Sequence, residues 1–414
     1  LAVMVVGALF FINDQNFDRS TVATLQIEDS TKTLAVLNKL QGQIVDAETG
    51  DKIPFASIST KDNRNTLSNE MGDFSIPVNE LPAELIISHL SYGKSVLKLE
   101  ENGDHIIRLK ATPILLPEVR VGNYARELVS HAAQKLMQNF SLKFYGKAIY
   151  RQSTQINQQT SEWQEIIYAT KSSNSRLEGT AVLKGRYAAQ EAVYKFEDFS
   201  YFTKAYGLID LDTNRHAVIS LTGSDLYNYS VANLRKEGER EIAEIRFTNK
   251  FPAGANSKYG TVFIDTETYD ILKITFITHS DLGLKMKNKH PLWVMKMVNP
   301  KYEFEISFKE VAGGRSIEYL KVQYQVDYHL KKEILPIHVS SLTYLYETST
   351  QATVMNYEKA NAGGNDRDLI KKFAYDPEYW NRNTVIERTP EQNRAIQNLE
   401  GKGAFGNALG TKKN

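Results

Sequence analysis

The sequence contains no cysteine among its 414 residues. The chain therefore holds no disulfide, no thiolate metal site and no cysteine nucleophile. It also lacks an excess of one charge, because 50 Lys and Arg residues stand against 49 Asp and Glu residues, a formal net charge of +1. Such a balance gives no electrostatic footprint for nucleic acid, so we expect no nucleic-acid partner.

Catalytic sequence motifs are missing as well. None of the eight histidines forms H-E-x-x-H, or the H-x-x-E pair with which zinc carboxypeptidases hold their metal. There is no G-x-S-x-G elbow and no Walker-type loop. Gly313 and Gly314 fit a hairpin turn better than a phosphate-binding loop. We therefore expect a protein that is not an enzyme and has neither cofactor nor metal, with an unrecognised hydrolase site as the alternative.

An uncharged apolar run stands at the amino terminus, from Leu1 to Ile12. It has the length of a signal-peptide h-region and is too short to span a bilayer. The charged region and initiator Met that precede such a segment are missing, so we expect the sequence to begin inside a signal peptide. Residues 1–15 are interpreted as its remnant and residues 16–39 as a linker; the alternative is a buried terminal strand or helix. The expected location is the periplasm or the periplasmic face of the outer membrane.

Residues 40–121 alternate short apolar strands with turns about every ten residues, the spacing of an all-β sandwich. The polar turn Asp46–Gly50 and the turn before the strand Asp73–Pro77 each end in a glycine that is free to take positive φ. Ala56 and Ile58 share one side of a strand, so that side can face a core. The last predicted strand covers residues 116–121.

One set of positions in this segment forms a recognisable pattern: Gly42, Val45, Asp46, Gly50, Pro54, Ala56, Ile58, Thr66, Gly72, Phe74 and the turn Ser91-Tyr92-Gly93. With these residues the segment resembles the carboxypeptidase-like regulatory domain, which has a transthyretin-like or prealbumin-like fold and is common in envelope proteins of Bacteroidota. The resemblance implies an accessory module without catalytic activity, found beside metallocarboxypeptidase domains or ahead of outer-membrane transport barrels.

Residues 122–350 are predicted to form one helix and a large antiparallel sheet. From Tyr124 to Phe140 the apolar residues follow the i, i+3, i+4, i+7 series of an amphipathic helix, with Asn123 as its candidate N-cap. Period-two alternation then continues for long stretches, as in Tyr302–Lys309 and Leu320–Tyr328, which gives each strand one dry and one wet face. Gly260–Phe276 is a hairpin that turns at Asp265–Asp270. We expect the helix, together with the curvature of the sheet, to shield the dry face from water.

These features predict a mainly β protein in which the sandwich is followed by a half-barrel-like sheet with a packed helix. The arrangement is similar to the half-barrel of periplasmic lipoprotein carriers. That similarity implies an apolar groove suited to acyl chains or an extended peptide. The alternative is that the same aromatic residues simply fill the core. The candidate groove residues are Phe276, Phe304, Phe308 and Tyr324.

Residues 351–414 are predicted to be a helical and flexible tail. Thr389 is a candidate N-cap, Pro390 stands at the first helical position, and Gln392 closes a capping box. A helix should therefore run from there to about Glu400. Trp380 is a candidate anchor that docks the tail onto the sheet.

Taken together, the sequence predicts a non-catalytic periplasmic or outer-membrane-associated binding or scaffold protein, whose partner is an envelope protein or a lipid. Edge strands of the sandwich could add a strand of the partner. The alternatives are a lipid or lipoprotein carrier with a half-barrel groove and an accessory component of an outer-membrane transport system.

Overall fold

The computed structural model describes most of the chain that follows the predicted signal-peptide remnant. The described residues are 38–115, 123–190, 195–196, 200, 218–219, 226–250, 257–279, 286–287, 295–330, 333–360 and 366–405. Asn38–Asn414 belong to one structural unit. The predicted signal-peptide remnant, nearly all of the predicted linker and the strand expected at 116–121 lie outside the described residues.

The amino-terminal module is a β-sandwich, as predicted. Its turn glycines Gly50 and Gly72 have φ of +76° and +75°, a conformation that glycine adopts without the steric cost of a side chain. Ala56 and Ile58 face the sandwich core together with Leu40, Ile44 and Phe74. One sheet has the order β4 (Asp73–Val78), β1 (Asn38–Asp46), β7 (Gly103–Leu109), and the other has the order β3 (Asn65–Leu67), β2 (Ser57–Thr60), β5 (Ala83–His89), β6 (Gly93–Leu99).

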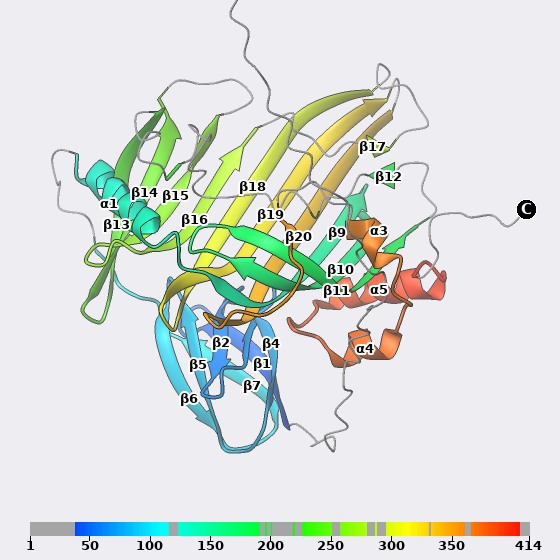
Figure 1. Ribbon diagram of the computed structural model, residues 1–414, viewed down its shortest axis with the longest axis horizontal. Helices are drawn as coiled ribbons and strands as arrows, with labels where there is room; N and C mark the ends of the chain where they lie inside the picture. The colour runs from blue at the N-terminus through cyan, green and yellow to red at the C-terminus, as the bar shows by residue number, and fades with distance from the viewer. Residues whose placement is uncertain are drawn as a thin grey trace, which may run out of the picture. The chain divides into compact units, whose positions relative to one another are not determined.

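The second module is dominated by a 12-stranded sheet in which every strand pair is antiparallel (Figure 1). Each edge of the sheet ends in a two-residue strand. Elsewhere, β12 (Lys195–Phe196) pairs with β17 (Met286–Lys287). The order of the large sheet is β21 (Glu358–Lys359), β11 (Leu177–Ala189), β10 (Gln159–Ser172), β9 (Phe144–Ile156), β20 (Glu333–Ser349), β19 (Gly314–Leu330), β18 (Met295–Val311), β16 (Ile271–Thr278), β15 (Lys258–Asp265), β14 (Arg240–Asn249), β13 (Tyr227–Glu237), β8 (Ile114–Leu115).

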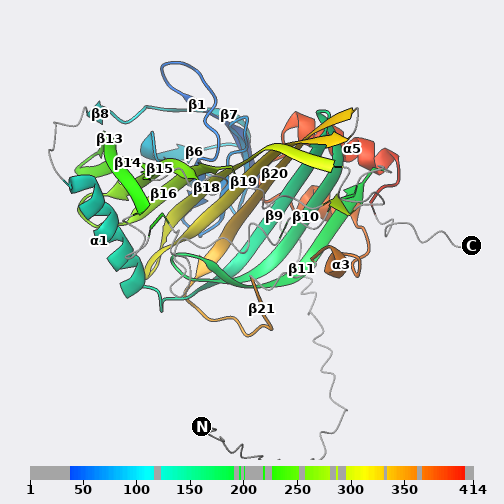
Figure 2. The ribbon, with the colours of Figure 1, turned by 90° about the horizontal axis from the view of Figure 1, so that it is seen from above.

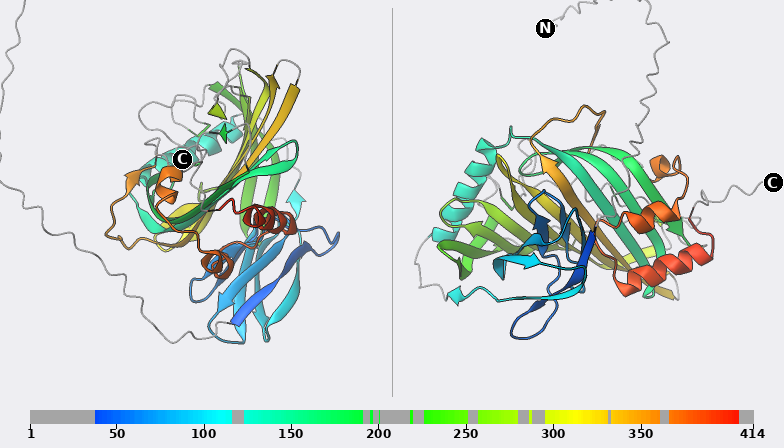
Figure 3. Two further views of the ribbon diagram at one scale, coloured as in Figure 1. Left: turned by 90° about the vertical axis from the view of Figure 1, so that its right-hand side faces the viewer. Right: turned by 90° about the horizontal axis from the view of Figure 1, so that it is seen from below.

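The period-two pattern of the sequence separates two faces of this curved sheet (Figure 3). We call the face that carries the alternating apolar residues of β18 and β19 the inner face. Its side chains form one large apolar cluster, which includes Tyr302, Phe304, Ile306, Val322 and Tyr324. We call the opposite face the outer face, where the alternating residues of β18 and β19 are mostly Lys, Glu, Gln and Ser. The division predicted from the sequence is therefore confirmed.

Helix α1 (Tyr124–Gln138) covers the inner face at the end of the sheet that contains β13, β14 and β15 (Figures 1 and 2). Its buried stripe belongs to the inner-face cluster, as its amphipathic pattern predicted. The helix ends at Gln138, slightly before the predicted end at Phe140. Asn123 occupies the N-cap position, but its side chain makes no capping hydrogen bond, in contrast to the prediction. Among the described residues, no helix is long and apolar enough to cross a membrane.

The described part of the tail forms three helices, α3 (Asp366–Ile370), α4 (Pro377–Arg382) and α5 (Pro390–Gly401). α4 and α5 lie on the outer side of the sheet, whereas α3 lies on the inner side (Figures 2 and 3). The predicted capping box of α5 is present, with Thr389 and Gln392 exchanging side-chain hydrogen bonds with each other's backbone. Trp380 is 1% exposed and packs against Ile149 and Ile167 in an outer-face cluster, so its predicted anchoring role is confirmed.

A buried charge cluster ties the tail to the sheet. The carboxylate of Glu165 on β10 is fully buried and contacts three guanidinium groups. Arg151 Nε on β9 and Arg186 Nε on β11 each donate to it at 2.8 Å, and Arg388 Nε of the tail lies 3.6 Å from it. Burial alone raises the pKa of Glu165, but the three guanidinium groups outweigh it and hold this pKa well below its usual range. We call these four residues the Glu165 cluster.

The sandwich contacts both the outer face and the tail. The ring of Phe55 lies 5.6 Å from the ring of Tyr319 on β19, and Lys321 Nζ lies 4.4 Å from the centroid of the same Phe55 ring. Thr66 Oγ1 donates a hydrogen bond of 2.6 Å to the carbonyl oxygen of Val385. The outer face is thus where the three parts of the described chain meet.

We predict that Glu165→Gln lowers the free energy of unfolding by about 3 kcal/mol at pH 7, because three buried guanidinium groups lose their counter-charge. Urea unfolding followed by circular dichroism measures the change. Glu378→Gln is the matched control, since its pair with Arg382 is 75% and 76% exposed and should contribute little. A loss no larger than that of the control would contradict the assigned role of the cluster.

Candidate functional site

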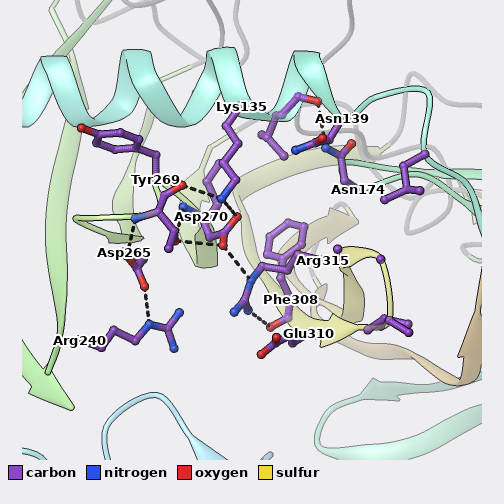
Figure 4. Close-up of a pocket in the computed structure, with 18 of the residues that line it drawn as sticks. Lys135, Asn139, Asn174, Arg240, Asp265, Tyr269, Asp270, Phe308, Glu310 and Arg315 are labelled. Carbon is purple, nitrogen blue, oxygen red and sulfur yellow. Dashed lines mark hydrogen bonds and ion pairs between the residues drawn. The ribbon is translucent and has the colours of Figure 1, made fainter. Parts of the chain in front are cut away.

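A cavity of about 1010 Å³ lies under the carboxyl-terminal half of α1, where several hairpin turns of the large sheet meet (Figure 4). Three of its walls are α1, the β15–β16 turn and the β18–β19 turn. Arg240 at the start of β14, Asn174 beyond the end of β10, and three sandwich residues, Ser59, Ile86 and Lys94, also line it. Its volume is at the upper end of the range usual for small-molecule sites.

The β15–β16 turn is shaped by its own sequence, Asp265-Thr-Glu-Thr-Tyr-Asp270. Asp265 Oδ1 accepts hydrogen bonds from the backbone N–H groups of Glu267 at 3.0 Å and Thr268 at 2.8 Å, the Asx-turn pattern that short acidic side chains favour. Thr268 Oγ1 donates to Asp270 Oδ2 at 3.0 Å. These local bonds hold both aspartates of the turn at the wall of the cavity (Figure 4).

Basic side chains from other elements neutralise these two aspartates. Lys135 Nζ of α1 lies 2.7 Å from Asp270 Oδ1, and Arg315 Nε of β19 lies 3.8 Å from Asp270 Oδ2. Arg240 Nε lies 2.5 Å from Asp265 Oδ2. The dashed lines in Figure 4 follow this chain of contacts.

The electrostatics at Asp265 favour an ionised carboxylate that is engaged by its neighbours. Burial tends to raise the pKa of Asp265, but the Thr268 N–H and the Arg240 guanidinium overcome this effect and lower that pKa below its ordinary value. A carboxylate held in this way is a weak base and is not available as an acid near pH 7. The geometry therefore suits recognition of a polar partner better than proton transfer.

One lining group has hydrogen-bonding capacity left over. Asn174 Nδ2 donates to the carbonyl oxygen of Leu136 at 2.9 Å, but its Oδ1 is buried without a donor in the described part of the chain. Buried polar atoms in native proteins are usually paired, so this oxygen is available to a bound group or to water. No group of three or more His, Asp or Glu residues suited to a metal ion occurs among the residues that the structure describes.

The four candidate groove residues lie together on the inner face. The rings of Phe276 and Phe304 stack with centroids 4.6 Å apart, and Tyr324 stacks on Tyr302 at 4.3 Å. Phe276, Phe304, Phe308 and Tyr324 all belong to the inner-face cluster and are at most 6% exposed. Phe308 also lines the cavity below α1. An open groove along these residues remains a prediction.

No sequence pattern marked the charged residues of this cavity as a site. Its Asp265–Asp270 turn and its Gly313-Gly314 turn were recognisable as turns, and both are present. Their convergence with Lys135 and Arg240 depends on the order of strands in the sheet, which no local pattern encodes.

Comparison with known families identifies the sandwich. Residues 40–121 match the family model described as CarboxypepD_reg-like domain, which confirms the resemblance for that segment. No curated protein matches the sequence.

Comparison with solved structures gives only slight similarities. A LolA superfamily protein from Nitrosomonas europaea aligns with 8% identity over 55% of this chain and 94% of its own, with a TM-score of 0.23. A DUF1329 family protein from Desulfovibrio piger aligns with 9% identity over 54% of this chain and 93% of its own, with a TM-score of 0.21. Alignments this weak do not establish a shared fold.

We predict that Asp265→Asn destabilises the protein by about 1 kcal/mol at pH 7, because the amide keeps the turn but loses the ion pair with Arg240. The pKa of Asp265 in the folded protein lies below 3.8, the ordinary pKa of an aspartate. Its ionised carboxylate therefore stabilises the fold above pH 3.8, and this contribution is lost as the pH falls through the lowered pKa. The difference in free energy of unfolding between Asp265→Asn and the parent protein should therefore be smaller at pH 3 than at pH 7.

Urea unfolding at pH 7 and pH 3 measures both differences. Asp51→Asn, in an exposed turn of the sandwich, is the control for loss of an aspartate charge. An Asp265→Asn penalty that is the same at both pH values would contradict the assigned ion pair.

Proposed function

We propose that this chain is a non-catalytic binding protein of the cell envelope, in which a carboxypeptidase-regulatory-like sandwich and a long-stranded sheet present a polar cavity to a partner protein. The observation that carries the proposal is that both aspartates of the cavity form ion pairs with basic side chains. Asp265 and Asp270 already hold Arg240, Lys135 and Arg315, which leaves a fixed arrangement of charges rather than a free acid or base. Fixed charges and unfilled hydrogen-bonding groups favour recognition of a partner.

The position of the cavity beside a sheet edge supports an extended partner segment. β6 is the edge strand of its sheet in the described sandwich, and Lys94 on β6 lines the cavity. An extended chain that paired with β6 would place side chains at the mouth of the cavity. Strand addition of this kind gives affinity through main-chain hydrogen bonds and specificity through pockets for side chains.

The periplasm, or the periplasmic face of the outer membrane, is the location that we propose. The apolar run Leu1–Ile12 has the length of a signal-peptide h-region, and the absence of cysteine suits an oxidising compartment.

A single introduced thiol tests both partner and location, because the chain has no other. Glu267→Cys places that thiol at an exposed position on the cavity wall. We predict that a membrane-impermeant, thiol-reactive photo-crosslinker labels this variant in cells whose outer membrane has been permeabilised. Illumination should then give one adduct of defined mass, identified by mass spectrometry. Failure to label such cells, with labelling only after lysis, would contradict the location.

A matched pair of charge reversals tests the cavity. Lys94 and Lys98 are both exposed on β6, but only Lys94 lines the cavity. Lys94→Glu should reduce the adduct at least fivefold, whereas Lys98→Glu should leave it unchanged. Two outcomes would contradict a partner site at the cavity. The first is an equal effect of the two charge reversals, and the second is an equally strong adduct from Glu80→Cys, which places the thiol in the remote β4–β5 turn.

A second candidate function is the carrier predicted from the sequence, favoured by the continuous apolar cluster on the inner face. Phe276, Phe304 and Phe308 lie on neighbouring strands of that face, and α1 contacts the strands at one end of the sheet. A lipid chain could be held between the sheet and its cover if the cover moved aside.

Under the carrier hypothesis, delipidated protein should bind a fluorescent 16-carbon fatty acid saturably. Phe304→Ala, on the inner face, should weaken that binding, and Phe263→Ala, on the opposite face of the same sheet, should not. Absence of saturable binding, or an equal loss in both variants, would remove the carrier as a candidate.

A further inference from the structure

A second cavity, of about 540 Å³, lies on the outer face of the large sheet beside the first turn of α5. Its floor is formed by β10, β9, β20 and β19. One wall is α5 from Thr389 to Ala395, and the opposite wall is Phe55 with the sandwich turn Asn69–Met71. The cavity is separate from the one below α1, since the two share no lining residue.

The strand register aligns the side chains of the floor in one row. Trp163 on β10 is paired with Ser153 on β9, Ser153 with Ser340 on β20, and Ser340 with Gln323 on β19. All four residues line the cavity. Because residues in register on one face of a sheet lie side by side, these side chains form a continuous polar strip that ends at an indole ring.

The adjacent positions extend this strip by one row. Gln155 on β9 is in register with His338 on β20, and both line the cavity. Their strands hold them next to Ser153 and Ser340, since residues i and i+2 of a strand share a face. The floor therefore presents two rows of hydrogen-bonding side chains.

Most of these groups lack a hydrogen-bond partner within the described chain. Trp163 Nε1 and His338 Nε2 are buried with no partner. The side chains of Ser153, Ser340 and Gln323 likewise make no hydrogen bond to other described residues. Buried polar atoms in native proteins are usually paired, so Trp163 Nε1 and His338 Nε2 are exceptions, whereas the half-buried Ser153, Ser340 and Gln323 are open to solvent or to a ligand. The strip is therefore positioned to bind something that supplies partners.

The charges of the lining balance. Two arginines, Arg151 and Arg394, stand against two glutamates, Glu70 and Glu391. Arg151 is already engaged by Glu165 at 2.8 Å and by Gln392 Oε1 at 3.4 Å. Burial lowers the pKa of His338, so its imidazole is neutral near pH 7. A site without net charge selects for a ligand without net charge.

We propose that this outer-face cavity binds a neutral, polyhydroxylated ligand, a segment of a glycan. A sugar hydroxyl both donates and accepts hydrogen bonds, which matches the hydroxyl groups of Ser153 and Ser340 and the amide of Gln323. The apolar C–H faces of a sugar ring require non-polar surface next to these groups. Phe55, Leu342 and Ile386 supply such surface in the same cavity.

The walls of this site are held in place before any ligand binds. Arg151 donates a hydrogen bond of 2.9 Å to the Ile386 carbonyl oxygen, and Gln155 Nε2 donates to Glu391 Oε1 at 3.2 Å. The capping box fixes the first turn of α5. A preformed site loses little conformational entropy on binding, which matters for a ligand whose individual hydrogen bonds contribute little net free energy.

Isothermal titration calorimetry with the purified chain tests the proposal. The probes are maltotriose, cellotriose, chitotriose and mannotriose, with the uncharged tripeptide Ala-Ala-Ala amide, acetylated at its amino end, as the non-sugar comparison. We expect saturable binding of at least one trisaccharide and none of the peptide. Gln323→Ala should weaken that binding about fivefold through the loss of one hydrogen-bonding group.

Gln325→Ala is the matched control. Gln325 lies two residues along β19 on the same face and is exposed, but it does not line the cavity. It should leave trisaccharide binding unchanged, and unfolding curves of the two variants should coincide. Three outcomes would overturn the proposal: no saturable binding of any trisaccharide up to about 10 mM, equal weakening by both variants, or binding of the peptide in place of the sugars. None of these outcomes bears on the cavity below α1.

Discussion

The described part of the chain depends on one buried carboxylate. Glu165 lies on the outer face, on the third strand from one edge of the large sheet, and is shared by Arg151, Arg186 and Arg388. Strands β9, β10 and β11 and the tail are therefore joined at a single point. Desolvating four charged groups is costly, and only their close mutual contact offsets that cost. Since α5 is one wall of the outer-face cavity and Arg151 is part of its lining, the same contact that fixes the tail also shapes a place where a ligand can bind.

The two faces of the large sheet differ in their side chains and in the elements that pack against them. The inner face carries the aromatic and aliphatic side chains that make the largest apolar cluster of the described residues, and it holds α1 against the sheet. The outer face carries polar side chains, yet it receives the sandwich and the tail. The apolar cluster around Trp380 and specific contacts such as Thr66 with Val385 hold them there together. Space remains between such contacts, which is why a cavity with unpaired hydrogen-bonding groups lies on this face.

Much of the fold could be predicted from the sequence because its signals are local. Alternation in β18 and β19, the amphipathic stripe of α1 and the capping box at Thr389 each need only neighbouring residues. The sites could not be predicted in the same way. Ser153, Ser340 and Gln323 look like an ordinary wet strand face until the strand order places them in one row. Asp270 meets Lys135 only after the β15–β16 turn and α1 have been brought together. The aromatic residues of the inner face were conspicuous because strand periodicity marks them.

The central claim is that this chain binds a protein partner in the envelope rather than carrying a lipid. Native mass spectrometry of the mature protein purified from its own envelope, with lipid extraction of the same sample, tests it most directly. The binding-protein proposal predicts a complex whose added mass is that of a polypeptide, with no stoichiometric lipid in the extract. A lipid that co-purifies in a fixed ratio with no protein partner would contradict it and would direct attention to the inner face around Phe304.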